Sequence, residues 1–316
     1  MSNHLLYIAM GKHRGMRRTT NEYLIAYKYP SNYDYCRRGV LLALADGVAM
    51  SKSGAEASQA AVSRLIDNYY SQPNSWDCRL ALLQAVKQVN AEVHRLYHKS
   101  STTLIAAVIH NANIFIAHVG DSRAYHYHDK MLEQVTNDHI VQKQRPKGGT
   151  KPKLTRAIGH RKTVKVDITE MPIHEGNTFL LVSDGVTRYL ENQHLQQLLR
   201  NSPTETVRDI IQASNQAGGI DNISAIIVRV GRVLQNEESL ANHLEQTRPQ
   251  IMVDIPDAMP VRKVVSAKIP LPFDRLRHEP LQTGRLPQGR GQFWPGIMIL
   301  LIVIIAMLAY SIFVKQ

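Results

Sequence analysis

The stretch Thr103–His128, TLIAAVIHNANIFIAHVGDSRAYHYH, contains three β-type runs separated by short polar turns. Thr103 to Ile109 and Ile114 to Val119 are apolar and rich in residues that favour strands. Ser122 to His128 begins a further hairpin, with a turn expected near Asp129 and Lys130. Because turns this short can join only antiparallel neighbours, the stretch predicts antiparallel sheet.

Strands and helices alternate in blocks on both sides of this stretch. The 3–4 spacing of apolar residues predicts helices, and continuous apolar runs predict buried strands. We expect strands at Tyr23–Tyr29, Val40–Ala45, Thr178–Ser183 and Ile223–Val230, and helices at Gly54–Tyr70, Arg79–Tyr97, Glu191–Leu199 and Thr204–Ala217. Hairpins followed by pairs of helices indicate an α/β (α+β) protein with mainly antiparallel sheets.

Four aspartates each lie in a short motif next to an apolar run: Asp46 in Leu-Ala-Asp-Gly, Asp121 in Gly-Asp-Ser-Arg, Asp184 in Ser-Asp-Gly and Asp221 in Ile-Asp-Asn. A single Asp-Gly pair is a common turn and would indicate nothing more. Together, carboxylates at the ends of separate strands can gather where loops meet. Oxygen ligands of this kind suit hard cations such as Mg²⁺ or Mn²⁺, so the pattern predicts a metal-ion hydrolase centre.

The positive charge of the chain is concentrated in one segment. Residues 139–166 contain nine Lys and Arg and no Asp or Glu, within a total net charge of +12. Such a segment suits nucleic acid, anionic lipid or a phosphorylated protein, and a solvated loop is the plain alternative. No aromatic residue interleaves these charges, which disfavours nucleic acid. The two cysteines, Cys36 and Cys78, have no metal-type spacing and indicate neither a zinc site nor a disulfide framework.

These motifs and their order resemble the metal-dependent type 2C protein phosphatase family, which removes phosphate from Ser and Thr. The resembling stretches are Arg18–Glu22, Leu42–Val48, Ser101–Thr103, Ile116–Tyr125, Thr136–His139, Leu154–Gly159, Leu181–Val186 and Asp221–Ile223. The Gly-Asp-Ser-Arg and Ser-Asp-Gly stretches are together the most specific. The resemblance implies a sandwich of two antiparallel β-sheets flanked by helices.

The resemblance also implies roles for individual residues. Asp46 would bridge two Mn²⁺ or Mg²⁺ ions, with the Gly47 carbonyl helping to hold the second. Asp184 and Asp221 would complete the shell of the first ion. Asp121, together with Asp184, would support a third, more weakly bound metal ion. Arg18 would bind the substrate phosphate, and Asn222 would align the ligands. A hydroxide held by the metal ions would attack phosphorus in line, without a phosphoenzyme.

The chain departs from the family pattern near Arg18. The family has a carboxylate after Asn-Glu or Asn-Gln, where this chain has Tyr23 after Asn21-Glu22. The missing carboxylate normally orders water around the second metal, and we expect Glu22 to substitute for it. A second departure is the basic segment after Asp138, which in the family borders the substrate channel and here favours acidic or multiply phosphorylated substrates.

The remainder of the chain predicts a tether. Residues 1–231 are expected to form the catalytic domain, and 232–292, with seven prolines, a linker. Ile297–Val314 is an uninterrupted run whose only polar members are a Tyr and a Ser, and its 18 residues would span about 27 Å as a helix. With Phe293 and Trp294 at one interface, we expect residues 293–316 to be a single-pass membrane anchor. Basic residues upstream place the catalytic domain in the cytoplasm, and the N-terminus has no signal peptide.

These observations predict a membrane-tethered phosphoserine and phosphothreonine phosphatase. Its partners would be phosphorylated proteins, among them a cognate Ser/Thr kinase and its substrates. Tyr23 favours one alternative, a weak or inactive phosphatase-like module that binds phosphoproteins as a scaffold, while Asp46, Asp184 and Asp221 argue against it. A second alternative is an enzyme of the same fold with a different kind of target.

Overall fold

The computed structural model of the protein describes residues 3–18, 21–30, 37–48, 53–97, 99–144, 150–234 and 250–252. The chain divides into two compact units, Met1–Ala267 and Lys268–Gln316, and all described residues belong to the first. Most of the predicted linker and the whole of the predicted anchor lie outside the described residues.

Two antiparallel β-sheets form the centre of the first unit, as the resemblance implied. The six-stranded sheet has the order β13-β1-β12-β11-β6-β7, and the five-stranded sheet has the order β10-β5-β4-β3-β2. A separate ribbon pairs β8 with β9. The strands are β1 (Asn3–His13), β2 (Tyr23–Lys28), β3 (Val40–Asp46), β4 (Leu104–His110), β5 (Asn113–Val119), β6 (Arg123–His128), β7 (Met131–Gln134), β8 (Ile140–Gln144), β9 (Thr150–Leu154), β10 (Asp167–Pro172), β11 (Thr178–Val182), β12 (Ile223–Leu234) and β13 (Gln250–Met252).

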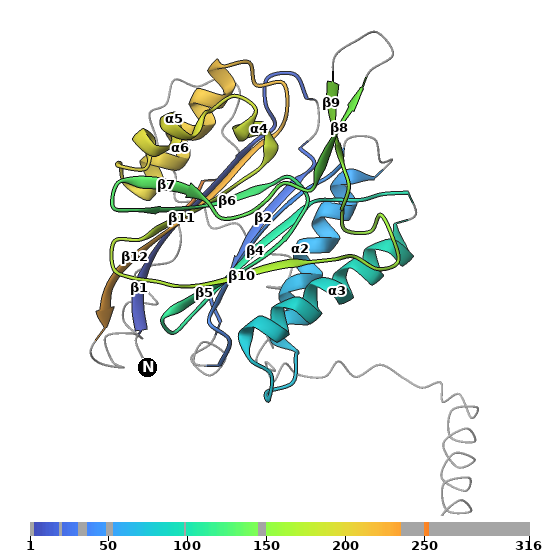
Figure 1. The fold of residues 1–316 in the computed structure, drawn as a ribbon, viewed down its shortest axis with the longest axis horizontal. Coiled ribbons are helices and arrows are strands. Elements are labelled where there is room, and N and C mark those ends of the chain that lie inside the picture. Colours follow the sequence, from blue (N-terminus) through green and yellow to red (C-terminus); the bar gives the residue numbers. More distant parts are fainter. Residues whose placement is uncertain are drawn as a thin grey trace, which may run out of the picture. The chain divides into compact units, whose positions relative to one another are not determined.

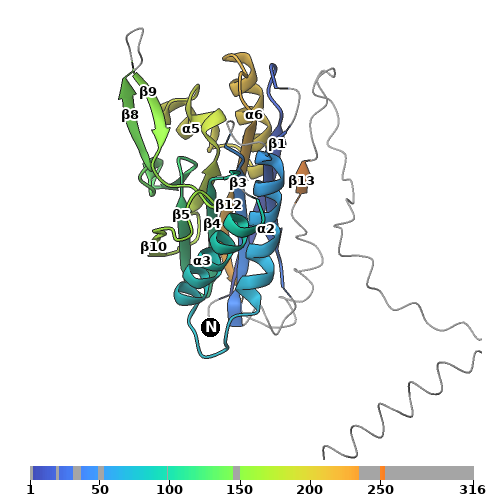
Figure 2. The ribbon, with the colours of Figure 1, turned by 90° about the vertical axis from the view of Figure 1, so that its right-hand side faces the viewer.

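Helices cover the outer face of each sheet, so that the unit has four layers (Figures 1 and 2). One apolar cluster lies between the five-stranded sheet and its helix pair, a second lies between the two sheets, and a third lies beneath the helices of the six-stranded sheet. The helices are α2 (Gly54–Tyr70) and α3 (Cys78–Leu96) on one side, and α4 (Asp184–Thr187), α5 (Asn192–Leu198) and α6 (Pro203–Gln216) on the other.

Both faces of each sheet are buried, which explains the continuous apolar runs. In β3, Leu42 and Leu44 pack between the sheets, while Leu41 and Ala43 pack against α2 and α3. Because successive side chains of a strand point to opposite faces, a strand buried on both faces has no place for alternating polar residues. Charged residues therefore occur where these strands end.

The opening stretch crosses from one sheet to the other. β4 and β5 pair within the five-stranded sheet, whereas β6 pairs with β7 and β11 in the six-stranded sheet. The crossing takes place at Gly120, whose φ is +125° and where a Cβ would lie 2.6 Å from Thr103. Only glycine tolerates both conditions. The predicted turn at Asp129 and Lys130 is confirmed, and both residues have positive φ.

The predicted helices over 54–70 and 79–97 are confirmed to within one residue at each end. Other parts of the fold differ from expectation, among them β10 (Asp167–Pro172) and α4 (Asp184–Thr187), which were not predicted. β1 was not predicted, although it pairs with β12 over ten registered positions. The basic segment was interpreted as loop-like, but β8 and β9 form a hairpin within it. In the predicted linker, Gln250–Met252 add a short parallel strand beside β1.

Within the described residues, no helix is both long and apolar enough to cross a bilayer. The predicted span Ile297–Val314 lies outside those residues.

The buried ring of His118 on β5 makes the stability of the fold sensitive to acid. His118 is 2% exposed and lies against the ring of His139, with the centroids 4.6 Å apart. Burial, and after it the charge of the neighbouring His139, lowers the pKa of His118 to about 4. Above about pH 6.5 the ring is neutral in both states. Below it the unfolded chain takes up a proton that the folded chain does not, so stability falls until about pH 4.

We expect His118→Leu to remove this contribution. The free energy of unfolding of the wild-type chain should fall more steeply between pH 6.5 and 4 than that of the variant, by up to about 1.4 kcal/mol per pH unit. Urea denaturation at several pH values measures both slopes, and His160→Gln, at an exposed histidine, serves as the control. Equal slopes for the wild type and His118→Leu would contradict the prediction.

Candidate metal centre

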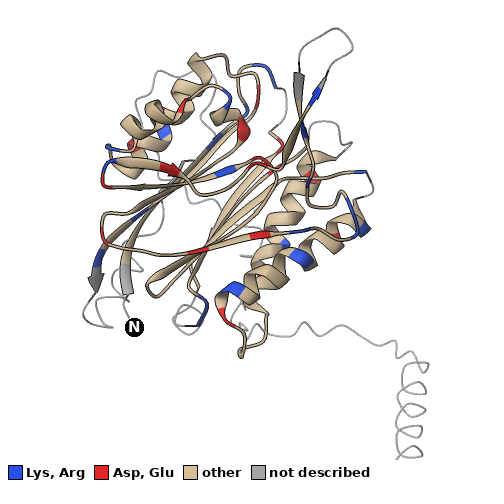
Figure 3. Ribbon diagram, in the orientation of Figure 1, with Lys and Arg blue, Asp and Glu red and all other residues tan. Residues whose placement is uncertain are grey.

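The four predicted aspartates lie at one end of the two sheets. Asp46 is the last residue of β3, and Asp121 follows β5 at the crossing between the sheets. Asp184 begins α4 directly after β11, and Asp221 precedes β12. Figure 3 shows acidic positions where α4 begins. Because β11 pairs antiparallel with β12 and with β6, the end of β11 lies beside the starts of β12 and β6, at the same end of the sheet.

Tyr23 lies among the carboxylates at this end of the sheets. Its Cα is paired with that of Asp46 across β2 and β3, and its side chain is 4% exposed. The Tyr23 hydroxyl donates a hydrogen bond of 3.0 Å to Asp184 Oδ1, and it lies near enough to Asp46 to lower the pKa of that carboxyl. Asp46 and Asp184 therefore lie within reach of a single phenol group.

Two arginines hold the other side of the cluster. Arg18 Nε donates to Asp221 Oδ1 at 2.9 Å, with about a third of its side chain exposed. Arg188 Nη2 contacts Asp184 Oδ2, and Arg188 Nη1 lies 3.2 Å from Asp221 Oδ2. One guanidinium thus joins two of the predicted metal ligands. The position of Arg18 leaves part of its guanidinium open to solvent, as a phosphate-binding arginine requires.

Burial and mutual repulsion raise the pKa values of these acids. For Asp46 the largest cause of the raised pKa is burial, followed by the charge of Asp184, while the hydrogen bond from Tyr23 opposes it. Burial and then Asp184 raise the pKa of Asp121 to about 7. Burial also raises the pKa of Asp184, and the charge of Arg188 opposes that rise. Such a cluster favours the binding of cations.

Threonines at the start of β4 fix the main chain around Asp46. Thr102 Oγ1 donates to the Asp46 carbonyl at 2.7 Å, and the Thr103 amide donates to the same carbonyl at 2.8 Å. The Asp46 amide donates to Thr103 Oγ1 at 3.2 Å. Gly47 continues this pairing through an isolated bridge to Thr102. The threonines therefore serve as supports for the ligand loop, and the main chain at Gly47 is rigidly positioned.

Asn222 ties three segments of the centre together. Its Oδ1 accepts from the Glu22 amide at 3.1 Å, and its Nδ2 donates to the Arg14 carbonyl at 2.8 Å. The Asn222 amide donates to Asp221 Oδ1 at 3.0 Å. Close packing supports this arrangement, because a Cβ on Gly185 would lie 1.8 Å from the Asn222 carbonyl. Asn222 therefore holds the Asp221 carboxylate in place through its main-chain amide, while its side chain is fixed by Glu22 and Arg14.

Glu22 contributes through its main chain. Its carbonyl accepts from the Gly47 amide at 3.1 Å and from Ser58 Oγ at 2.6 Å. Among the described residues, no contact joins the Glu22 carboxylate to Asp46, Asp184 or Asp221. The expected substitution of Glu22 for the missing family carboxylate therefore has no support in these contacts, and the Tyr23 hydroxyl is the group that lies among the aspartates.

The donor set suits Mn²⁺ or Mg²⁺, although the side chains are turned toward other partners. No group of three or more His, Cys, Asp or Glu in the described part of the chain is arranged to hold a metal ion as it stands. Tyr23, Arg18 and Arg188 instead engage oxygens of Asp184 and Asp221. The chemistry nevertheless fits, because these are carboxylate oxygens in a cluster where burial, and then the charge of Asp184, raises the pKa values of Asp46 and Asp121.

Arg188 and the Tyr23 hydroxyl were not predicted as members of the centre. Arg188 follows Asp184 by four residues, and the i,i+4 spacing on a helix places two such side chains on one face. That spacing was therefore a usable signal. The family resemblance had singled out Tyr23 only as the replacement of a carboxylate. Its hydrogen bond to Asp184 depends on the pairing of β2 with β3 and on the packing of the two sheets.

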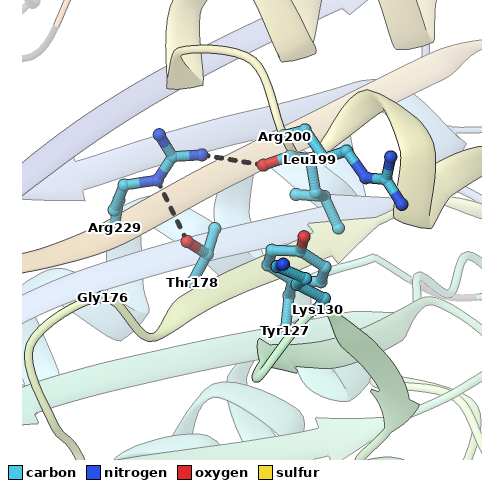
Figure 4. A pocket seen from close by; sticks show the side chains of 7 residues that line it. All are labelled: Tyr127, Lys130, Gly176, Thr178, Leu199, Arg200 and Arg229. Atoms are coloured by element: carbon cyan, nitrogen blue, oxygen red, sulfur yellow. Dashed lines mark hydrogen bonds between the residues drawn. The ribbon is translucent and has the colours of Figure 1, made fainter.

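The cavity of about 520 Å³ shown in Figure 4 is a separate feature. It lies near Thr178, at the end of β11 remote from Asp184, and Arg229 spans it with hydrogen bonds to Thr178 Oγ1 and to the Leu199 carbonyl. Its lining comprises Tyr127, Lys130, Gly176, Thr178, Leu199, Arg200 and Arg229. None of these is an acid or a predicted site residue, so the cavity is not the metal centre.

Comparisons with known proteins identify protein phosphatases as relatives of this chain. The serine/threonine phosphatase stp of Listeria monocytogenes is 31% identical over 218 residues, which cover 60% of this chain and 83% of the relative. The protein phosphatase PhpP of Streptococcus pneumoniae is 27% identical over 240 residues, covering 68% and 93%. The crystal structure of the PstP catalytic domain in complex with two manganese ions has a TM-score of 0.59 at 25% identity, covering 72% of this chain and all of that one.

The sequence model of protein phosphatase 2C matches residues 32–223, which is more than half of the chain. The matched region contains Asp46, Asp121, Asp184 and Asp221. On this evidence the chain belongs to the protein phosphatase 2C family.

Proposed function

We propose that the protein hydrolyses phosphoserine and phosphothreonine in proteins with Mn²⁺ or Mg²⁺ at the carboxylate cluster. The observation that carries the proposal is the meeting of Asp46, Asp184 and Asp221 at one end of the two sheets, beside the positioned main chain of Gly47. The names of the relatives support the reaction, and the PstP structure supports manganese.

Each residue has a distinct part in this reaction. Asp46, Asp184 and Asp221 would hold the metal ions, with the Gly47 carbonyl as a further oxygen ligand. Bound divalent ions supply a nucleophile from water at neutral pH and offset the negative charge of the phosphate. Arg18, anchored on Asp221 and partly exposed, would bind the phosphate oxygens through its planar guanidinium. Asn222 and Thr102 keep the ligand loops in place.

We expect the full-length protein to hydrolyse a phosphothreonine peptide only when Mn²⁺ or Mg²⁺ is present. Asp184→Asn keeps the shape of the side chain and removes its charge, and we expect it to lower kcat/KM by at least about 100-fold. Arg18→Lys keeps the charge and removes the guanidinium fork, so it should chiefly raise KM. Release of inorganic phosphate from the peptide measures both effects.

The same measurement separates the enzyme from the scaffold alternative. Tyr23 and Arg188 engage carboxylate oxygens of the centre, which is the observation that favours a weak or inactive module. A wild-type chain without metal-dependent turnover, together with retained binding of the phosphopeptide, would favour the scaffold. Arg200→Gln, at an exposed arginine away from the centre, should leave turnover unchanged.

The basic segment supports acidic or multiply phosphorylated proteins as substrates. β8 and β9 carry Lys143 and Lys153, and further basic positions follow between β9 and β10 (Figure 3). A cognate Ser/Thr kinase and its substrates would supply such phosphoproteins. Nucleic acid remains disfavoured because no aromatic side chains interleave these charges.

We also propose that residues 293–316 anchor the catalytic domain to a membrane, with the domain in the cytoplasm. The support is the apolar run Ile297–Val314, which is long enough as a helix to match the core of a bilayer. Residues 232–292 contain seven prolines and would act as an extended tether.

We expect the full-length protein to sediment with membranes and to resist extraction by high salt. Deletion of residues 293–316 should release it into the soluble fraction, because the apolar run provides the affinity for lipid. The matched control replaces the run by an equally long Leu-Ala segment, which should restore sedimentation. Equal sedimentation of the deleted and full-length proteins would contradict the anchor.

A further inference from the structure

Arg188 is the cation most closely built into the carboxylate cluster. Its guanidinium contacts Asp184 Oδ2 and lies 3.2 Å from Asp221 Oδ2. Its side chain is 49% exposed, whereas both carboxylates are 13% exposed. Arg188 therefore reaches from the surface into the centre and ends between two of the predicted metal ligands.

The contacts of Asp184 and Asp221 divide between their two oxygens. Asp184 Oδ1 accepts from the Tyr23 hydroxyl at 3.0 Å, and Asp221 Oδ1 accepts from Arg18 at 2.9 Å. Arg188 takes the Oδ2 atom of both. The Oδ2 atoms of both carboxylates therefore face Arg188, whereas their Oδ1 atoms face two different groups, Tyr23 and Arg18.

The positive charge of Arg188 also acts on the Asp121 carboxyl. Apart from burial, the two largest influences on the Asp121 carboxyl are the negative charge of Asp184 and the positive charge of Arg188. Asp121, Asp184 and Arg188 are therefore electrostatic neighbours. The space beside Asp121 and Asp184, which the family resemblance assigns to a third metal ion, lies within the field of this guanidinium.

We propose that Arg188 acts as a permanent cation beside Asp121 and Asp184, so that the centre holds two divalent metal ions and excludes a third. An arginine side chain stays charged at all physiological pH values, and because it is part of the chain it cannot dissociate as a metal ion can. It engages Asp184 Oδ2, an oxygen that the third ion would need, and it repels a divalent cation at short range. The inference rests on the proposed metal-dependent function.

The number of bound Mn²⁺ ions tests this inference directly. The full-length protein, purified in detergent and freed of metal, is titrated with MnCl₂ into the millimolar range. The electron paramagnetic resonance signal of free Mn²⁺ then reports the bound fraction. We expect the wild type and Arg188→Lys, which keeps the charge, to bind two ions. Arg188→Asp, which replaces the cation by a further ligand, should bind a third.

Two further variants make the result specific. Asp121→Asn introduced into Arg188→Asp should return the number of bound ions to two, because it removes a ligand of the third position. Arg200→Gln removes an arginine outside the centre and should bind two ions, as the wild type does. Circular dichroism confirms that each variant is folded before its titration.

The number of bound ions distinguishes failure of this inference from failure of the proposed metal-dependent function. A wild-type protein that binds three ions, or a folded Arg188→Asp protein that still binds two, would overturn the inference and leave the proposed function intact. A wild-type protein that binds no Mn²⁺ would overturn the two-metal centre itself, and the inference with it.

Discussion

Burial of both faces of both sheets is the constraint on which the rest of the structure depends. β3 and β11 have apolar neighbours above and below, so the carboxylates next to them, Asp46 and Asp184, lie at strand ends. Antiparallel pairing then brings the ends of β3, β11 and the start of β12 to one edge. The four aspartates meet there because the packed layers leave them no other place.

This meeting has an electrostatic consequence that shapes the centre. Burial of these carboxylates, and then their mutual repulsion, raises the pKa values of Asp46, Asp121 and Asp184. Cations relieve that repulsion. Arg18 and Arg188 supply part of the positive charge from the chain, the Tyr23 hydroxyl supplies a hydrogen bond, and divalent metal ions would supply the remainder.

The sequence predicted those elements whose pattern is local. The helices α2 and α3 show the 3–4 spacing of an amphipathic helix, and β3, β4, β5 and β11 are apolar runs bounded by turns. β1 was missed although Leu5–Met10 is an uninterrupted apolar run, and its pairing with β12 identifies it as a strand. The β8–β9 hairpin was missed because its composition is that of a charged loop, whereas three residues of β13 are too few to form a pattern.

For the site, the sequence alone determined the aspartates and their family, because Asp46, Asp121, Asp184 and Asp221 each lie in a short motif next to an apolar strand. Only the tertiary structure decided which groups surround them. Tyr23 reaches Asp184 across 161 residues of sequence, and Arg18 reaches Asp221 across 203. Such contacts depend on strand pairing and on the packing of two sheets, and neither leaves a trace in the spacing of residues along the chain.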